Sequence, residues 1–259
     1  MKRNPITRHQ SGFTLIELLA ALGIFLVICG AAFTLLGTTQ KRYQSDSQVL
    51  NSFQEARLGM DQMVRDINDA GFPPPSYFAT TSVINQTQFA STPFAFSPYP
   101  SSCQVASSCT TPGDFDLIVQ TNIEPQNTNA VSWIRYQLVG TTLMRGISPM
   151  VANEDPTSDV QLSQAMTPYV QNVMNNSPTA QLQAAYPAIF PSGNPVPVFT
   201  YTCDSSTGPQ SCLIISGTPA TIRDITITLI VMAPIPDGQS GQPRLVQLNG
   251  RGRRINPSQ

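Results

Sequence analysis

The sequence predicts an α+β protein, in which one long N-terminal helix packs on a C-terminal antiparallel β-rich head and its first half spans a membrane. Three observations predict this class. The segment from Phe13 to Gly37 is apolar, Gln40 to Asp69 keeps a helical pattern without proline, and the chain after Gly71 alternates short apolar runs with turn residues. The expected divisions are a leader at 1–12, the helix at 13–70 with its span at 13–37, and the head at 71–259.

The apolar run from Phe13 to Gly37 is long enough to cross a membrane, since about 20 apolar residues span a bilayer. Lys2, Arg3 and Arg8 precede it without an acid, which favours a cytoplasmic N-terminus. A secretory signal peptide has a shorter apolar core followed by a small-residue cleavage site, and none is present here. A simple anchor fits the length, but it does not explain Glu17. A charge inside a span is costly, so Glu17 is a functional candidate.

The helix is expected to continue to Asp69, because apolar residues recur at three- and four-residue spacing. The stripe consists of Leu50, Phe53, Met60, Val64 and Ile67, widened by Val49, Ala56, Met63 and Ala70. Arg57 interrupts it, while Asp66 and most other charged residues are expected outside it. Gly71 and the prolines that follow end the helix. One helix of this length would measure roughly 85 Å, more than a globular core needs. The stripe is expected to lie on the protein's own sheet, with a dimerising coiled coil as the alternative.

The head is expected to be built from short strands separated by Pro, Ser, Asn and Gly clusters. The expected strands are Phe115–Val119, Val131–Val139, Thr142–Arg145, Thr200–Thr202, Leu213–Ile215, Ile222–Met232 and Leu245–Leu248. Residues 146–197 are expected to be mostly loop, with Tyr169 to Met174 as one further candidate strand.

Four of the five cysteines form two close pairs in turn-rich segments, Cys103 with Cys109 and Cys203 with Cys212. In an oxidising compartment each pair could form a disulfide. The spacing is not that of a zinc site, and no histidine is available to join one. Cys29 lies in the apolar run, where a cysteine is usually a small apolar residue.

The sequence indicates no catalytic residue, no metal and no cofactor. The single histidine, His9, lies in the leader, which excludes Ser-His-Asp and Cys-His chemistry from the rest of the chain. Asp114 with Asp116, or Glu154-Asp155 with Asp159, could form an acid pair or a calcium loop, but solvated loop acids are the expectation. Phosphate-loop and dinucleotide motifs are absent. We therefore expect a non-enzyme.

Charge gives little reason to expect a nucleic-acid partner. Charged residues make up 11% of the chain and the net charge is −1. The cluster Arg251-Gly252-Arg253-Arg254 could contact phosphates, but we expect it to be a solvated tail.

The segment Gly12-Phe13-Thr14-Leu15-Ile16-Glu17, with its basic leader and apolar continuation, resembles the N-terminal signal of type IV prepilins and type II secretion pseudopilins. The resemblance implies that a prepilin peptidase cuts between Gly12 and Phe13 and then methylates the amine of Phe13. It also implies a pilin fold and packing of the apolar helix into a filament with other pilins or pseudopilins. Major pilins often carry a proline deep in this helix, and this chain has none there.

The resemblance gives Glu17 an assembly role. In a staggered filament, the new Phe13 amine of one subunit can meet Glu17 of its neighbour. The hypothesis is that this carboxylate serves that pairing and not the stability of the monomer. The alternative is that Glu17 only reaches the membrane interface.

Looser resemblances narrow the family. Six segments, taken in their order along the chain, are similar to PilW-type minor pilins and J-type pseudopilins: MVRDINDAGF, VSWIRYQLVGTTLMR, PYVQNVMNN, FTYTC, IRDITITLIV and VQLNGRGR. Residues 176–197 resemble an insertion relative to these proteins. This implies a minor pilin that joins or primes a type IV pilus through an inner-membrane assembly platform. The head would lie in the periplasm before the subunit enters a pilus or pseudopilus. A type II secretion pseudopilin and an exposed adhesive or DNA-binding subunit are the alternatives.

Overall fold

The structure is a computed structural model and describes residues 13–70, 103–109, 111–122, 131–149, 166–176, 178–237 and 241–253. The chain divides into two compact units, Met1–Ser47 and Gln48–Gln259, and each is described here by itself. The described part of the first unit is helical from Leu15 onward, and its large apolar side chains are exposed.

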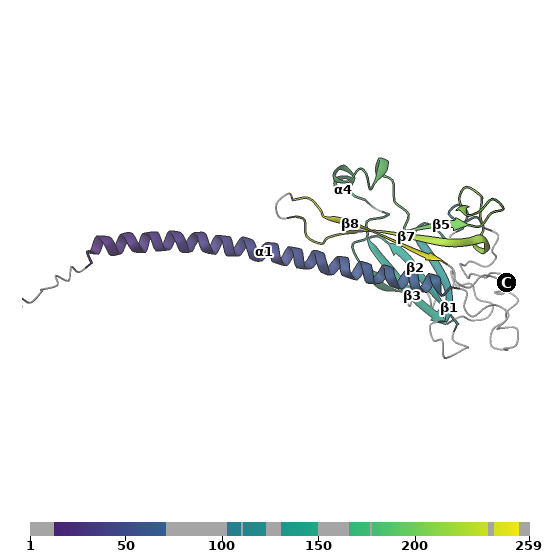
Figure 1. Cartoon of the computed structure of the whole chain (residues 1–259), viewed down its shortest axis with the longest axis horizontal. Coiled ribbons are helices and arrows are strands. Elements are labelled where there is room, and N and C mark those ends of the chain that lie inside the picture. Colours follow the sequence, from purple (N-terminus) through teal and green to yellow (C-terminus); the bar gives the residue numbers. More distant parts are fainter. Residues whose placement is uncertain are drawn as a thin grey trace, which may run out of the picture. The chain divides into compact units, whose positions relative to one another are not determined.

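The long helix α1 covers Leu15–Asn68 without interruption (Figure 1). In the second unit, the buried apolar side chains of α1 are Val49, Ala56, Met60, Met63 and Ile67, and Ala70, just after the helix, is buried as well. Ala56, Met60, Met63, Ile67 and Ala70 belong to the core of the chain's own head, which supports packing on a sheet over the coiled coil. The predicted stripe was wrong at its edges, because Leu50 is 59% exposed and Asp66 is buried.

The first sheet is an antiparallel meander in the order β1-β2-β3-β4. Its strands are β1 Asp116–Asn122, β2 Val131–Val139, β3 Thr142–Pro149 and β4 Thr167–Val170. A two-residue turn joins β2 to β3, and Gly140 takes the positive φ of 60° that such a turn needs.

The second sheet has the order β6-β5-β7-β8, and it is also antiparallel. Its strands are β5 Phe199–Cys203, β6 Gln210–Ser211, β7 Ile222–Met232 and β8 Leu245–Arg253, with the short 3₁₀ helix η2 Pro219–Thr221 before β7. The alternation of Ile225, Ile227 and Leu229 places these three buried side chains on the core face of β7.

Helix α1 contacts both sheets. Tyr169 and Val170 of β4 lie against Gly59, and Gly250 and Gly252 of β8 lie against the opposite flank of the buried face. A Cβ on Gly252 would collide with Ile67, so this glycine permits the close approach of strand and helix. The helix and both sheets therefore share one core. The long helix and the antiparallel β-rich head confirm the predicted α+β class and agree with the pilin fold that the resemblance implies.

The segment between β4 and β5 was predicted to be mostly loop, but it carries some structure of its own. The strand there is Thr167–Val170, earlier than the expected Tyr169 to Met174, and Val173 makes only an isolated bridge to Val231. Helix α4 Ala180–Ala185 and the 3₁₀ helix η1 Pro191–Gly193 follow. Their Leu182 and Phe190 pack with Ile230 in a small second core.

The predicted strand Leu213–Ile215 was wrong. These residues form a turn after β6, in which the amides of Ile214 and Ile215 donate to the Ser211 carbonyl. Leu213 and Ile214 are 60% and 76% exposed. A short apolar run resembles a strand in sequence, but the neighbouring disulfide at Cys212 closes the chain into a turn before it can extend.

Candidate processing and assembly site

The start of α1 is a capping box formed by Thr14 and Glu17. The backbone amide and the hydroxyl of Thr14 both donate to Glu17 Oε2 at 3.0 Å, and the Glu17 amide donates to Thr14 Oγ1 at 3.4 Å. The pattern Thr-x-x-Glu is the sequence signature of such a box, so Thr14 could have been recognised from the sequence. Thr14 is a residue that our sequence reasoning missed.

This geometry gives Glu17 a role within its own helix, and its pairing with the Phe13 amine of a neighbouring subunit stays a prediction. Glu17 already satisfies hydrogen bonds of its own helix, and a carboxylate in the first turn also interacts favourably with the helix dipole. The arrangement holds the carboxylate of Glu17 four residues along the chain from the exposed Phe13. Gly12, and with it the expected cleavage point, lies outside the described residues.

The first part of α1 is apolar enough to span a membrane. It contains an 18-residue window with a mean hydropathy of 2.6, and none of that window is buried in the structure. Phe13, Leu15 and Ile16 are each at least 75% exposed. Such a surface is stable in lipid or against other apolar helices, and not in water.

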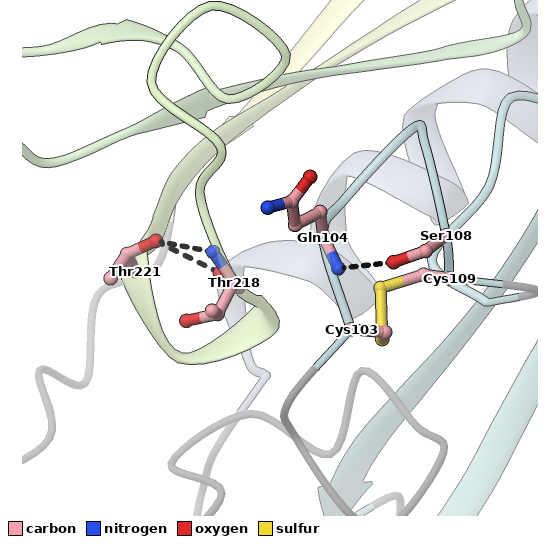
Figure 2. The surroundings of a disulfide bond; sticks show 6 residues. All are labelled: Cys103, Gln104, Ser108, Cys109, Thr218 and Thr221. Atoms are coloured by element: carbon pink, nitrogen blue, oxygen red, sulfur yellow. Dashed lines mark hydrogen bonds between the residues drawn. A yellow bond between two sulfur atoms is a disulfide. The ribbon is translucent and has the colours of Figure 1, made fainter.

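Both cysteine pairs in the head are joined. The structure contains the disulfides Cys103–Cys109 and Cys203–Cys212, while Cys29 is free. Figure 2 shows the first disulfide next to the turn that carries Thr218 and Thr221. The two loops are hydrogen-bonded to each other, because the Val105 amide donates to the Gly217 carbonyl at 2.9 Å.

Asp116 is not the solvated loop acid that we expected. It lies at the start of β1 and accepts from Arg135 Nε at 3.0 Å and from Gln137 Nε2 at 3.1 Å. Burial raises the pKa of Asp116, although Arg135 and Gln137 oppose the shift. Asp114 does not share this ion pair. Burial also raises the pKa of Asp114.

The other expected acid group, Glu154-Asp155 with Asp159, lies outside the described residues. Within the described ranges, no three His, Cys, Asp or Glu side chains are grouped so that they could hold a metal ion.

A buried polar cluster that the sequence did not indicate joins α1 to the first sheet. The Tyr136 hydroxyl and Arg145 Nη2 both donate to Asp66 Oδ2, the latter at 3.0 Å. Arg145 Nε donates to the Tyr136 hydroxyl at 2.9 Å, and Gln62 Nε2 donates to Asp66 Oδ1 at 2.8 Å. Burial, followed by the charge of Asp66, raises the pKa of Tyr136 far above its usual range, so the phenol stays a donor.

The arginine cluster near the C-terminus is not a free tail. Arg251 and Arg253 belong to β8, and both face the buried Asp224 of β7 across the ladder, whereas Arg254 lies outside the described residues. Arg251 donates to Asp224 at 2.7 Å. The expectation was wrong because β8 extends five residues beyond the predicted Leu248 and pairs with β7 over its full length.

The comparisons with known proteins bear on the N-terminus. Neither the curated proteins nor the solved structures contain a match to this chain. Residues 7–35 match the family model of the prokaryotic N-terminal methylation motif, a range that includes Gly12, Phe13 and Glu17. The chain thus carries a type IV pilin-like prepilin signal, which implies processing by a prepilin peptidase and supports a subunit of the type IV pilin or pseudopilin type.

Proposed function

We propose that this chain is a minor pilin-like structural subunit that is inserted in the inner membrane, processed by prepilin peptidase, and joins or primes a type IV pilus. The observation that carries the proposal is the methylation motif at residues 7–35, which includes the first part of the exposed apolar helix that begins at Leu15. A subunit that keeps such a helix after processing can pack it against the helices of other subunits, where its apolar surface is removed from water.

The minor-pilin assignment is supported by the segments that resemble PilW-type minor pilins and J-type pseudopilins. They include the hairpin of β2 and β3, the strands β5, β7 and β8, and the end of α1. These are the elements that build the core of the head, and Asp66 and Tyr136 of the buried cluster lie within them. The insertion 176–197 contains α4 and η1, which pack mainly with each other and with β7.

We propose that Glu17 acts in assembly from its position in the capping box. Thr14 holds the carboxylate near the start of the helix, next to the amine that cleavage would create on Phe13. An amine arriving from a neighbouring subunit would form an ion pair with a carboxylate that is already oriented, which lowers the ordering cost of the contact. The head would then serve as a structural module and not as an enzyme.

Intact-mass spectrometry of the membrane fraction tests the processing step. The mature mass should correspond to loss of residues 1–12 and addition of one methyl group at Phe13. Gly12→Val should block cleavage, because its side chain crowds the expected cut site. A mature mass of the normal size from Gly12→Val would contradict the proposal.

A deletion strain separates a pilus subunit from a secretion pseudopilin. For a minor pilin, deletion should reduce the number of sheared surface filaments and leave the export of secreted enzymes unchanged. Complementation with the wild-type gene restores the filaments, and complementation with Gly12→Val does not. Loss of enzyme export with normal filaments would instead assign the chain to type II secretion.

A further inference from the structure

Within the part of the chain that the structure describes, strand β8 forms an open edge of the second sheet. It is nine residues long and is the last strand in the order β6-β5-β7-β8 (Figure 1). Among the described residues, only β7 pairs with it. An edge strand with free backbone groups is a template for another strand.

The hydrogen bonds around β8 show which backbone groups face the open side. Next to the pair Met232 and Leu245, the Ala233 amide donates to the Arg244 carbonyl at 2.8 Å, so the even-numbered residues of β8 make the ladder with β7. At the other end of the strand, the Arg253 amide donates away from β7, to Asn68 Oδ1 at 2.8 Å. The amide and carbonyl groups of Gln247, Asn249 and Arg251 therefore point to the open edge.

The side chains of these odd-numbered residues form an exposed, positively charged face. Arg251 and Arg253 are each 64% exposed, although both face Asp224, which is only 2% exposed. Arg223 also approaches Asp224, at 3.7 Å, and pairs with Asp204 at 3.3 Å. The three arginines and two aspartates of this group carry a net charge of one positive unit. Most of the exposed guanidinium N–H groups remain available to bind a further acceptor.

The opposite face of the strand is apolar near the same edge. Val246 and Leu248 are only half-buried, and Leu248 packs at the border of the main core. An added strand would therefore place alternate side chains in two different environments, one beside arginines and one beside aliphatic groups.

We propose that the β8 edge binds an extended, acidic peptide segment of another protein, which adds a strand to the second sheet. The backbone of Gln247, Asn249 and Arg251 supplies the pairing, and Arg251 and Arg253 bind carboxylates at alternate positions of the segment. A second copy of β8 fits less well, because the odd-numbered residues from Leu245 to Arg253 include two arginines and no acid. This inference concerns the head, and it does not depend on the filament role proposed above.

Residue-resolved hydrogen exchange on the full-length protein in detergent micelles tests the proposal. The probes are two synthetic nonapeptides, one alternating Glu and Val and one alternating Lys and Val. The amides of Gln247, Asn249 and Arg251 should exchange fast in the free protein. Their exchange rates should fall by roughly tenfold when the Glu peptide is present at about ten times its dissociation constant. The amides of Leu248 and Gly250, which bond to β7, should be protected in both states. Edge amides that are already protected without peptide, or equal protection by the Lys peptide, would overturn the proposal.

A pair of variants at Asn249 isolates the backbone contribution. Asn249→Pro removes one outward amide and leaves the ladder to β7 intact, and it should abolish protection by the Glu peptide. Asn249→Ala keeps the amide and should bind as the wild type does. Because Asn249→Pro could disturb the strand itself, protection of Leu248 and Gly250 in each variant reports whether β8 is still paired.

Arg253→Gln gives an independent readout, since it lowers the charge without touching the edge amides of Gln247, Asn249 and Arg251. It should weaken Glu-peptide binding and reduce the dependence of binding on salt. Unchanged affinity and unchanged salt dependence in Arg253→Gln would overturn the acidic specificity.

Discussion

Asp66 is a carboxylate on the buried face of a helix, where most proteins place an apolar side chain. The desolvation cost of burying this carboxylate is offset by hydrogen bonds that it accepts from three side chains, those of Tyr136, Arg145 and Gln62. Burial lowers the pKa of Arg145, but its contacts with Tyr136 and Asp66 more than offset this and raise that pKa overall. The guanidinium also lies 5.7 Å from the ring centres of Tyr136 and Tyr169. The cluster therefore fixes one rotational position of α1 on the first sheet, since an apolar contact alone would tolerate small rotations.

Removal of the carboxylate should destabilise the head strongly. Asp66→Ala leaves Arg145 and the Tyr136 hydroxyl without their shared acceptor, which should cost about 3–5 kcal/mol of unfolding free energy. Tyr136→Phe removes one hydrogen bond and should cost about 1–3 kcal/mol. Denaturant unfolding of the full-length protein in detergent measures both losses of unfolding free energy. The control is Asp61→Ala, at an exposed position, whose unfolding free energy should lie within about 0.5 kcal/mol of wild type. A loss for Asp66→Ala no larger than that for Asp61→Ala would contradict this account.

Asp114 should make stability depend on pH in an unusual direction for an acid. Burial raises its pKa above the usual 3.8, so the folded head binds this proton more readily than the unfolded chain does. That stabilising contribution is complete below the unfolded pKa and is lost as the pH rises through the raised folded value. Asp114→Asn, which stays neutral, should therefore melt at a higher temperature than wild type at pH 7. At pH 3 the two melting temperatures should converge. A melting temperature at pH 7 equal to or lower than that of wild type would show that desolvation of Asp114 is unimportant.

At the scale of elements, the close approach of α1 and β8 depends on a residue with no side chain. Gly252→Ala should cost about 1–3 kcal/mol of unfolding free energy, because its methyl group would displace Ile67. Gly250→Ala is the matched control. Its methyl group would meet the flexible Met60 at 3.0 Å, so the loss should be smaller. Double-mutant analysis with Ile67→Ala checks the cause, since the combined loss should be smaller than the sum of the single losses. If the double variant loses the full sum of the two single losses, the destabilisation by Gly252→Ala does not come from its contact with Ile67.

The two disulfides close loops of the head, and Cys203 and Cys212 are also buried members of the main core. Each closes a short loop, with sequence separations of 6 and 9 residues, and should contribute roughly 2–3 kcal/mol. Replacing Cys203 and Cys212 together by Ser should lower the melting temperature and expose the β5–β6 turn to protease, while Cys29→Ser should change neither. Non-reducing peptide mapping gives the pairing directly. Free thiols at all four head positions would contradict an oxidising compartment for the head.

Sequence patterns located the elements with strong periodicity and missed those that depend on contacts from distant parts of the chain. The apolar run, the continuous helix and the strand Ile222–Met232 could be predicted, because each carries many residues of one pattern. The role of Asp66 could not, since its partners Tyr136 and Arg145 are 70 and 79 residues away in the sequence. The turn at Leu213 was misread as a strand because a short apolar run does not reveal whether a neighbouring disulfide will close the chain. At the N-terminus, Phe13 and Glu17 were identified from the motif, whereas the capping role of Thr14 was overlooked.

At the scale of the whole molecule, Glu17 has two possible uses, and one comparison separates them. If the carboxylate pairs with a neighbour's amine, Glu17→Ala should keep insertion and cleavage but lower incorporation into sheared filaments by roughly tenfold or more, the equivalent of one charge-assisted hydrogen bond. Thr14→Ala removes the capping hydroxyl but keeps the carboxylate and its hydrogen bond from the backbone amide of residue 14, so it should assemble much better than Glu17→Ala and somewhat less well than wild type. Immunoblots of filament and membrane fractions give the ratio of assembled to unassembled subunit for each variant. Similar losses in both variants would assign Glu17 to the helix cap alone.

The continuity of α1 has a mechanical consequence. The helix runs without a break across the division at Ser47, and its last turns are part of the core of the head. Tension applied to the N-terminal part of the chain would not be absorbed by an extensible linker, because none separates the helix from the head. It would instead reach the core of the head through the last turns of α1. The buried hydrogen bonds of Asp66 and the close contact at Gly252 are the points at which that tension would be resisted.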